Sequence, residues 1–395
     1  MEGVYLVGGA RSPFGRYGGK LAAVRPDDLL AHLIRKVVER LPQVPFEAYD
    51  DCFIGCANQA GEDNRNVARM ALLLADMPVE VPGVTVNRLC ASGLEAILQG
   101  ARAIATGEAH LVLAGGVESM TRAPFVLPKA ETPFSRKTEL YDTTLGWRFP
   151  NPRLAEKHPL YSMGETAENV AQKYHIPRSD QDAYAFRSQQ RYQAALQQGF
   201  YEAEIVPIPL PDGSLFSADE HPRPDTTLEK LAQLKPAFRA GGTVTAGNSS
   251  GINDGAAVVL LASEAALKRY DLTPLAQIRG GATAGVDPAY MGIGPVPATQ
   301  KLLNRLGLPL HEIDLIELNE AFAAQVLACV KLLELDESRL NPHGGAIAIG
   351  HPLGATGARL ALTAARSLHW HAKRYALVTL CVGVGQGVSL LLERA

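Results

Sequence analysis

The chain has 395 residues, of which 47% are hydrophobic and 20% are charged, and its formal net charge is −3. This composition is sufficient for a large buried core, and the lack of a basic excess argues against a protein that binds nucleic acid. We expect no signal peptide and no membrane span, and we interpret the five cysteines as reduced thiols of a cytoplasmic protein.

Strands alternate with helices along the first 119 residues. Strands are predicted at 4–7, 51–55, 84–86 and 110–116, and helices at 26–41, 64–77 and from 92 to about 104. Such alternation is typical of α/β proteins. We therefore predict a largely parallel sheet with helices on both faces.

Residues 120–248 interrupt this alternation, because they are rich in Pro, Lys, Arg and aromatic residues. One long polar helix is predicted from Ser179 to about Gln198, with Ser179 and Asp182 as its N-terminal cap pattern. Long excursions of this kind are usually functional. We interpret the segment as an inserted lid or binding lobe.

The alternation returns after residue 248. Strands are predicted at 256–262, 276–284, 314–318 and 375–382, and helices from 263, at 296–306, at 320–333 and from 357 to about 369. A helix that begins with Gly and leads into a buried strand occurs at 93–116 and again at 357–383. We therefore predict an internal duplication, with one half at 1–119 completed by 249–270, an insertion at 120–248, and a second half at 271–395.

Cys90 lies where the strand at 84–86 meets the helix that begins at Ser92. Free backbone N–H groups and the positive end of the helix dipole at such a junction favour a thiolate. Cys90 is therefore a candidate nucleophile. The alternative is a small buried hydrophobic side chain, as most free cysteines are.

Three later segments place reactive side chains among glycines. Asn319 precedes a predicted helix, His351 lies between Gly350 and Pro352, and Cys381 ends a predicted buried strand. Helix capping is the alternative role of Asn319, and a structural role is the alternative for His351. In α/β sheets, ligands bind beyond the carboxyl ends of the strands, which is where Cys381 lies.

Two thiols and one imidazole at such junctions can carry out covalent catalysis. One thiolate can attack a carbonyl carbon, the imidazole can take its proton, and the second thiol can transfer a proton on the opposite side. Gly383 allows a backbone N–H to approach a developing oxyanion. The glycines at 383–387 do not form a dinucleotide-binding fingerprint, and Cys52 and Cys56 have no second pair to complete a zinc site.

The chain resembles the thiolases, which are acetyl-CoA acyltransferases, over essentially its whole length. The resemblance implies an α/β fold with a duplicated five-layered α-β-α-β-α body and an inserted loop domain. It is carried by six motifs: Asn87-Arg-Leu-Cys-Ala-Ser-Gly93, Gly115-Gly-Val-Glu-Ser-Met120, Thr245-Ala-Gly-Asn-Ser-Ser-Gly-Ile-Asn-Asp-Gly255, Asn319-Glu-Ala-Phe-Ala323, Gly344-Gly-Ala-Ile-Ala-Ile-Gly-His-Pro-Leu-Gly354 and Cys381-Val-Gly-Val-Gly-Gln-Gly387.

The resemblance also implies a reversible Claisen condensation by a ping-pong route. Cys90 would carry the acyl group as a thioester, and His351 would accept its proton. Cys381 would deprotonate the methyl group of a second acetyl-CoA, or protonate the leaving enolate in the thiolytic direction. His351 and a water held by Asn319 would bind the enolate oxygen, and the N–H groups of Cys90 and Gly383 would form a second oxyanion hole. No metal or redox cofactor is implied, since the thioester itself acidifies the α-carbon.

Further residues are implied to bind the substrates, acyl-CoA and coenzyme A. Ser162 stands where many short-chain thiolases have a histidine before the Met-Gly pair. Thiolases form dimers or tetramers, so a homo-oligomer is expected. The implied contacts with coenzyme A are Arg223, Phe238, Ala246 and Ser250, and those with the pantetheine arm and acyl end are Ser162, Met163, Met291, Ala321 and Phe322.

Residues 55–69 and 144–152 look most like the 3-oxoadipyl-CoA thiolases of aromatic catabolism. Such a substrate has a distal carboxylate, with which Arg148 or Arg65 could pair, although ordinary loop packing is an equal alternative for both. Acetoacetyl-CoA and longer 3-oxoacyl-CoAs stay open as substrates. Two alternatives for the whole protein are a decarboxylating ketoacyl synthase, which needs no second thiol such as Cys381, and an inactive acyl-CoA-binding protein.

Overall fold

The computed structural model describes residues 2–395 and contains two halves with the same order of strands. In the first half the elements are β1 (Val4–Arg11), β2 (Gly15–Arg16), α1 (Pro26–Glu39), β3 (Asp51–Gly55), α2 (Val67–Leu74), β4 (Val84–Val86), α3 (Ser92–Ala105), β5 (Leu111–Ser119), β10 (Asn253–Ser263) and α8 (Glu264–Arg269). In the second half they are β11 (Ala276–Gly285), α9 (Pro295–Leu306), β12 (Leu315–Leu318), α10 (Ala323–Leu333), α11 (Ala346–Ile349), α12 (Leu353–Trp370), β13 (Tyr375–Val382) and β14 (Gln386–Arg394).

The strands follow the order β12-β13-β14-β11-β1-β10-β5-β3-β4. In each half a parallel pair, β3 with β5 or β12 with β13, is followed by two antiparallel neighbours. The halves meet where Tyr5 and Leu6 of β1 pair with Gln277 and Ala276 of β11. This repeated order is the topology of a duplicated α/β unit.

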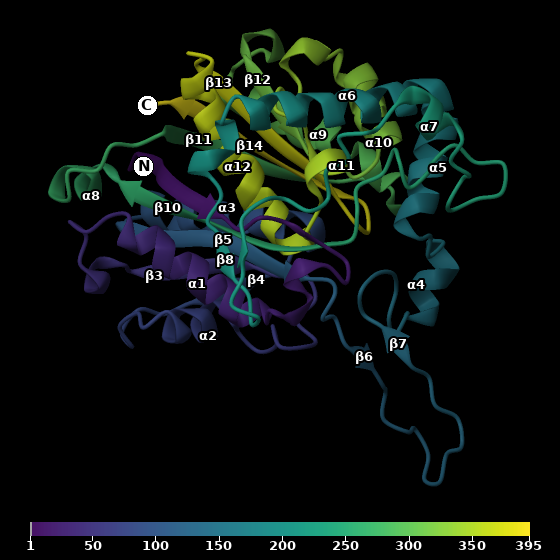
Figure 1. The fold of residues 1–395 in the computed structure, drawn as a ribbon, viewed down its shortest axis with the longest axis horizontal. Helices are drawn as coiled ribbons and strands as arrows, with labels where there is room; N and C mark the ends of the chain where they lie inside the picture. The colour runs from purple at the N-terminus through teal and green to yellow at the C-terminus, as the bar shows by residue number, and fades with distance from the viewer. Residues whose placement is uncertain (1) are drawn as a thin grey trace.

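Five layers of helices and sheet result from this arrangement (Figure 1). Helices α1 and α2 cover the outer face of the first sheet region, and α9 and α10 cover the outer face of the second. Between the two sheet regions lies a central layer of α3 and α12, which pack against each other and against β5, β10, β13 and β14. The fold is therefore the five-layered α-β-α-β-α body that the family resemblance implies.

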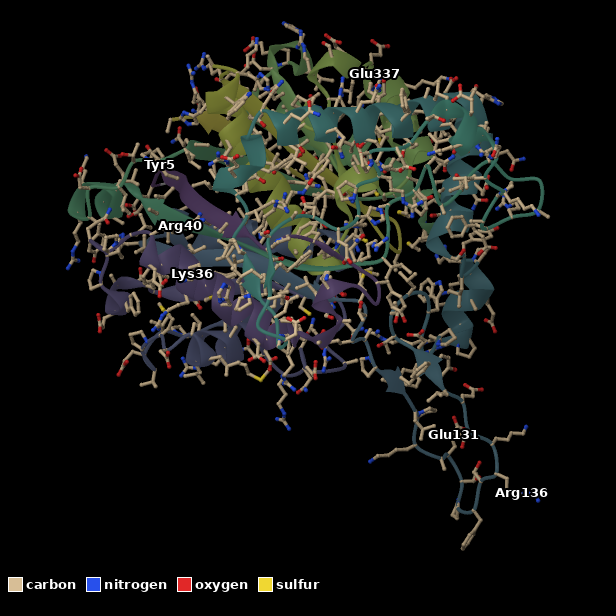
Figure 2. All side chains as sticks on the ribbon, in the orientation of Figure 1. Tyr5, Lys36, Arg40, Glu131, Arg136 and Glu337 are labelled. Atoms are coloured by element: carbon tan, nitrogen blue, oxygen red, sulfur yellow. The ribbon has the colours of Figure 1, made fainter. Side chains whose placement is uncertain are left out.

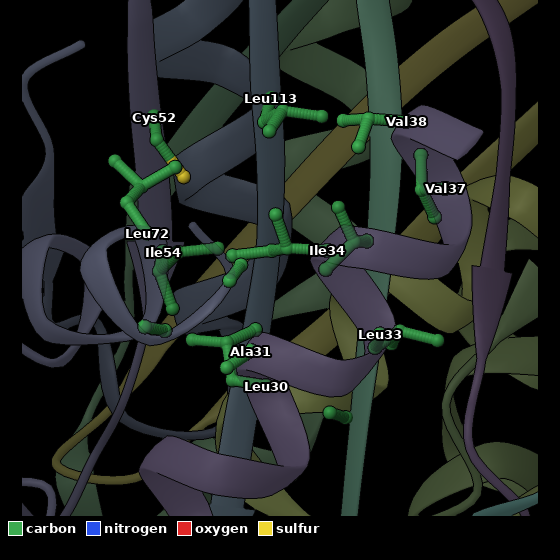
Figure 3. Packing of buried hydrophobic residues seen from close by; sticks show 14 of the residues in the cluster. Leu30, Ala31, Leu33, Ile34, Val37, Val38, Cys52, Ile54, Leu72 and Leu113 are labelled. Carbon is green, nitrogen blue, oxygen red and sulfur yellow. The ribbon is translucent and has the colours of Figure 1, made fainter. Parts of the chain in front are cut away.

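The helix α1 illustrates how sequence directs this packing. It begins with Pro26, which is pre-organised for the first helical position, and Asp27 and Asp28 complement the helix dipole. Its apolar stripe includes Leu30, Ile34, Val37 and Val38. This stripe faces buried side chains of β3 and β5 (Figure 3). No helix among residues 2–395 is both long and apolar enough to cross a bilayer.

Glycines let α3 and α12 approach closely. A methyl group on Gly93 would lie 2.5 Å from the carbonyl oxygen of Gly354, and one on Gly357 would lie 2.3 Å from the backbone nitrogen of Leu94. Both helices begin just after the segments that carry the predicted catalytic residues. Their close crossing therefore brings the two halves of the candidate site together.

A long excursion connects β5 to β10 and packs largely over the second half (Figure 1). Its residues 127–140 connect the short strands β6 and β7 as an arm that projects away from the body, with Glu131 and Arg136 pointing outward from it (Figure 2). The elements of the excursion are β6 (Phe125–Val126), β7 (Tyr141–Asp142), α4 (Pro152–Lys157), α5 (Met163–Tyr174), α6 (Arg178–Gln197), β8 (Ile208–Pro209), β9 (Leu215–Phe216) and α7 (Leu228–Ala232).

The structure corrects three predictions about these elements. The sheet is mixed, because β10 and β14 return beside β5 and β13 in the antiparallel sense. The last strand, β14, was not predicted, since its sequence follows the glycine-rich turn at 383–385. The long helix begins at Arg178 after Pro177 without a side-chain cap, and Asp182 instead pairs with Arg178 at 2.7 Å.

Candidate active site

Cys90 lies in a one-turn 3-10 helix (Leu89–Ala91) between β4 and α3. Leu89, which precedes it, has a φ of +46°, a strained conformation for a branched residue. The Ser92 hydroxyl holds this turn, since it accepts from the Arg88 N–H at 2.9 Å and donates to the Leu89 carbonyl at 2.7 Å. Cys90 therefore lies in a strained turn that the Ser92 side chain stabilises.

The Cys90 thiol is the partly exposed one among the five cysteines, and the other four are buried. It lies in the wall of a cavity of about 270 Å³. Burial raises the pKa of the Cys90 thiol, although the backbone N–H groups of Gly383 and of Cys90 itself oppose this rise by hydrogen bonding to the sulfur. The prediction that this junction favours a thiolate is therefore wrong, because loss of hydration outweighs the two backbone N–H groups.

The same two N–H groups have a second consequence. Gly383 lines the same cavity as Cys90, and the N–H groups of both residues lower the Cys90 pKa, so they are donors that can stabilise an oxyanion beside the sulfur. A methyl group on Gly383 would lie 3.2 Å from Leu89 Cδ1 and 3.6 Å from Met163 Sδ, so this position is tightly packed. The geometry places Gly383, from the second half, against Cys90 from the first.

His351 is buried between α11 and α12. Its backbone N–H donates to Asn253 Oδ1 at 2.9 Å, and its Nδ1 lies 2.7 Å from the Thr356 hydroxyl oxygen. Gly350, with a φ of +108°, allows this approach, since a methyl group there would lie 2.6 Å from Asn253 Cγ. Burial, together with the charge of Arg359, lowers the pKa of His351 to about 3, so the imidazole is neutral at pH 7.

Asn319 is fully buried next to His351, and its Nδ2 lies 3.3 Å from His351 Nε2. It does not cap the helix that follows, because α10 begins at Ala323 with Phe322 as its N-cap. The side-chain oxygen Oδ1 of Asn319 is buried without a hydrogen-bond partner among the described residues. A buried acceptor of this kind can hold a water molecule or a polar substrate atom.

Cys381 is buried at the end of β13. Burial raises the pKa of its thiol well above the ordinary value, and the neighbouring Cys90 and Cys329 thiols add to the rise. The strand β13, which carries Cys381, packs against the 3-10 turn that carries Cys90. Cys381 therefore rests as a thiol, which can donate a proton.

Glu118 is a residue of this site that the sequence reasoning did not single out, although it lies in the quoted motif at 115–120. It lines the cavity beside Cys90, and its carboxylate accepts from the backbone N–H groups of Ala57, Asn58 and Gly354 at 2.8–3.0 Å. Burial raises its pKa to about 7. Glu118 thus fastens the loop after β3 to the start of α12.

Glu118 also belongs to the one group of possible metal ligands among residues 2–395, with Cys56 and Asp63, whose ligand atoms lie within 4.8 Å of one another. The Cys56 thiol donates to Asp63 at 3.5 Å, and Glu118 accepts from backbone amides. These contacts provide hydrogen-bond partners for the Cys56 thiol and for both carboxylates, so the three residues form a structural hydrogen-bond network.

Most of the predicted substrate contacts gather around Cys381. Met163, Met291, Ala321 and Phe322 pack with it in one apolar cluster. Phe238, which is partly exposed, stacks edge-to-face on Phe322 with ring centroids 6.1 Å apart. An apolar wall of this kind suits the methylene and amide groups of a pantetheine arm.

Of the remaining predicted contacts, Arg223 and Ala246 lie apart from this cluster, whereas Ser250 and Ser162 adjoin it. Arg223 and Ala246 line a separate cavity of about 150 Å³, and the Ser250 backbone N–H donates to the Ala321 carbonyl at 2.9 Å. The Ser162 hydroxyl is occupied in a capping box with Glu165 at the start of α5. Sequence could have found this box, because Ser162-Met-Gly-Glu165 has the capping-box spacing.

The duplicated α/β fold and this set of thiols, imidazole and backbone donors define an acyltransferase. The chain belongs to the thiolase family, since it matches the thiolase N-terminal domain over residues 4–265 and the thiolase C-terminal domain over residues 272–394.

Individual relatives cover the whole chain. The chain is 56% identical to the beta-ketoadipyl-CoA thiolase of Pseudomonas aeruginosa, over 99% of both chains. It is 55% identical to the 3-oxoadipyl-CoA/3-oxo-5,6-dehydrosuberyl-CoA thiolase of Escherichia coli, over 100% of both.

Solved structures agree with this assignment of the fold. The acetyl-CoA acetyltransferase of Bacillus anthracis superposes with a TM-score of 0.94 at 41% identity, covering 100% of this chain and 99% of that one. The human mitochondrial 3-ketoacyl-CoA thiolase in complex with CoA gives a TM-score of 0.93 at 41% identity, with 100% and 98% coverage.

Proposed function

We propose that this protein cleaves 3-oxoadipyl-CoA with coenzyme A, giving succinyl-CoA and acetyl-CoA, as a step in the catabolism of aromatic compounds. The Cys90 turn supports the chemistry, because a thiol in a cavity with two backbone N–H groups at its sulfur is arranged for thioester formation. The substrate is supported by relatives more than 50% identical over the full chain whose names specify this acyl group.

In the first half-reaction the Cys90 sulfur attacks the 3-oxo carbon, and its proton passes to Nε2 of the neutral His351. The C2–C3 bond then breaks, with its electron pair leaving as the enolate of acetyl-CoA. The Cys381 thiol protonates C2 of that enolate, and acetyl-CoA departs. The raised pKa of Cys381 suits this step, since the thiol must carry its proton into the reaction.

In the second half-reaction coenzyme A enters and gives its thiol proton to the Cys381 thiolate. Its sulfur then attacks the Cys90 thioester carbon. The Cys90–acyl bond breaks, and the sulfur recovers the proton held by His351. Both thiols and the neutral imidazole are thereby restored, so protons and electrons balance over the cycle.

Two sites would stabilise the oxyanions of this cycle. The amides of Gly383 and Cys90 serve the tetrahedral intermediates at Cys90. His351 and a water held by the unpartnered Oδ1 of Asn319 serve the enolate oxygen. The thioester acidifies C2 without help from a metal or redox group, so we propose that coenzyme A and its thioesters are the only organic small molecules required.

We further propose that the protein is a cytoplasmic homo-oligomer, a dimer or tetramer. The five unpaired cysteines suit a reducing compartment. The projecting arm at 127–140 exposes Leu127, Leu140 and the whole side chain of Phe134, which favours burial against a second copy. Light scattering coupled to size exclusion tests the assembly, and a monomer at micromolar concentration would contradict it.

The function is tested by thiolysis of 3-oxoadipyl-CoA, acetoacetyl-CoA and longer unbranched 3-oxoacyl-CoAs, compared by kcat/KM. We expect the highest value for 3-oxoadipyl-CoA. A higher value for acetoacetyl-CoA would leave the thiolase chemistry intact and overturn the substrate.

A further inference from the structure

The cavity beside Cys90 contains one guanidinium in an otherwise mostly apolar wall. Leu89, Met120, Leu145, Trp147 and Leu353 supply apolar surface to it. At about 270 Å³ it exceeds the roughly 150 Å³ of a cavity that holds a benzene molecule, so it has room for more than an acetyl group. Arg148 and Glu118 are the two lining residues with charged side chains.

Arg148 is held in place by two backbone carbonyl groups. Its Nη2 donates to the Asn58 carbonyl at 2.9 Å, and its Nη1 lies 3.3 Å from the Thr143 carbonyl. The Asn58 side chain in turn donates to the Thr143 carbonyl at 3.0 Å, and the Thr143 hydroxyl donates to the Pro124 carbonyl at 2.6 Å. The guanidinium is therefore fixed by two loops that are bonded to each other.

The charge of Arg148 has no carboxylate counter-ion in the described part of the chain. Both of its partners are neutral carbonyl oxygens, and no carboxylate among residues 2–395 lies within ion-pair distance. The oxygens of Glu118 are instead occupied by the N–H groups of Ala57, Asn58 and Gly354. A guanidinium has five N–H donors, so several remain for a ligand.

Arg65, the other arginine considered from the sequence, lies elsewhere. It is exposed in the loop between β3 and α2, with a φ of +62°, and it does not line the cavity. The structure thus separates two arginines that sequence alone could not distinguish.

We propose that Arg148 binds the distal carboxylate of the acyl group carried by Cys90 and selects acyl chains that end in a carboxylate. The proposal rests on the proposed function and adds the residue that recognises the acyl group of the substrate. A planar guanidinium pairs with a carboxylate through parallel hydrogen bonds, and the apolar wall around it strengthens this pairing. An acyl chain that ends in a methyl group would occupy the same cavity but would leave the Arg148 guanidinium without a carboxylate partner.

The test compares 3-oxoadipyl-CoA with 3-oxohexanoyl-CoA, which has the same six-carbon chain and ends in a methyl group. Arg148→Met removes the charge and keeps most of the bulk. We expect kcat/KM for 3-oxoadipyl-CoA to fall about 100-fold and that for 3-oxohexanoyl-CoA to change by less than about threefold. Arg65→Met is the matched control and should leave both values at the wild-type level.

Each result decides the proposal. An equal fall on both substrates means that Arg148 only supports its loops, and no change on either means that it does not touch the acyl group. Arg148→Gln, which can still donate to the Asn58 carbonyl, is the second variant if Arg148→Met does not fold, and its ratio of the two kcat/KM values is read in the same way. A wild-type enzyme without preference for 3-oxoadipyl-CoA overturns the proposed substrate before any variant is compared.

Discussion

The Thr356 hydroxyl fixes which nitrogen of His351 carries the proton. Its oxygen lies 2.8 Å from the Pro352 carbonyl, to which it donates its single proton, and 2.7 Å from His351 Nδ1. The hydroxyl must therefore accept a hydrogen bond from Nδ1–H. Nε2 is left unprotonated and faces Asn319, which is the state that a proton acceptor for Cys90 requires.

Thr356→Val should lower kcat by about 10- to 100-fold with little change in KM, because it removes the group that orients the imidazole but leaves the substrate contacts in place. Steady-state thiolysis measures both parameters. Thr356→Ser keeps the hydroxyl and should retain most of the activity. If valine and serine behave alike, the hydroxyl does not set the tautomer.

Cys90→Ala should abolish the covalent acyl-enzyme and lower the turnover by more than about 10³-fold, since no other partly exposed thiol is available. Intact-protein mass spectrometry after incubation with acyl-CoA detects the added acyl mass. The matched control is Cys381→Ala, which should still acylate. An acyl adduct on Cys90→Ala would assign the nucleophile to another residue.

Cys381→Ala should stop the exchange of the acetyl-CoA methyl protons with solvent and lower turnover by about 10²- to 10⁴-fold, because it removes the proton donor and acceptor for C2. Deuterium incorporation, followed by nuclear magnetic resonance, measures the exchange. Exchange at the wild-type rate in this variant would show that a different base acts on C2.

Alkylation of Cys90 by iodoacetamide should accelerate with rising pH across the neutral range. Burial raises the pKa of this thiol above its ordinary value of 9.0, so below that pH the thiolate fraction, and with it the rate, rises about tenfold per pH unit. The measurement is the rate of modification between pH 6 and 9, with acyl-CoA as the protecting control. A rate that levels off near pH 7 would instead indicate a resting thiolate–imidazolium pair.

Local sequence patterns predicted most elements of the fold, because amphipathic helices and continuous apolar strands are both visible in short stretches of sequence. The strands β3 and β13 and the start of α1 lie where the periodicity places them. Strand direction was not predictable from such patterns, since β10 pairs with β5 only after an excursion of more than a hundred residues. The domain boundaries at 119, 248 and 270 stay a prediction.

Sequence patterns likewise identify some residues of the candidate site and miss others. Cys90, His351 and Cys381 stand out in sequence as reactive groups at element ends, and the family motifs single them out. The contributions of Thr356 and Glu118 depend on hydrogen bonds that form only when distant segments pack, such as that between Glu118 and Gly354. The raised pKa of Cys90 likewise depends on burial, which a local pattern does not reveal.

Gly357→Ala should destabilise the protein and reduce activity together. The added methyl group would lie 2.3 Å from the Leu94 backbone nitrogen, so α12 must move away from α3. Alanine favours the helix by up to about 1 kcal/mol over glycine, but forcing apart a close-packed crossing costs about 1–3 kcal/mol. The net loss is measured by urea denaturation, and the displaced Cys90 turn should lower kcat as well.

The matched control is Gly100→Ala in α3. There the added methyl group meets side-chain atoms only, with Val112 Cγ2 nearest at 3.0 Å, and these can shift by rotation. It should therefore cost less than Gly357→Ala while offering the same gain in helix propensity. A Gly357→Ala protein as stable and active as the wild type would show that the α3–α12 crossing does not hold the two halves of the site in register.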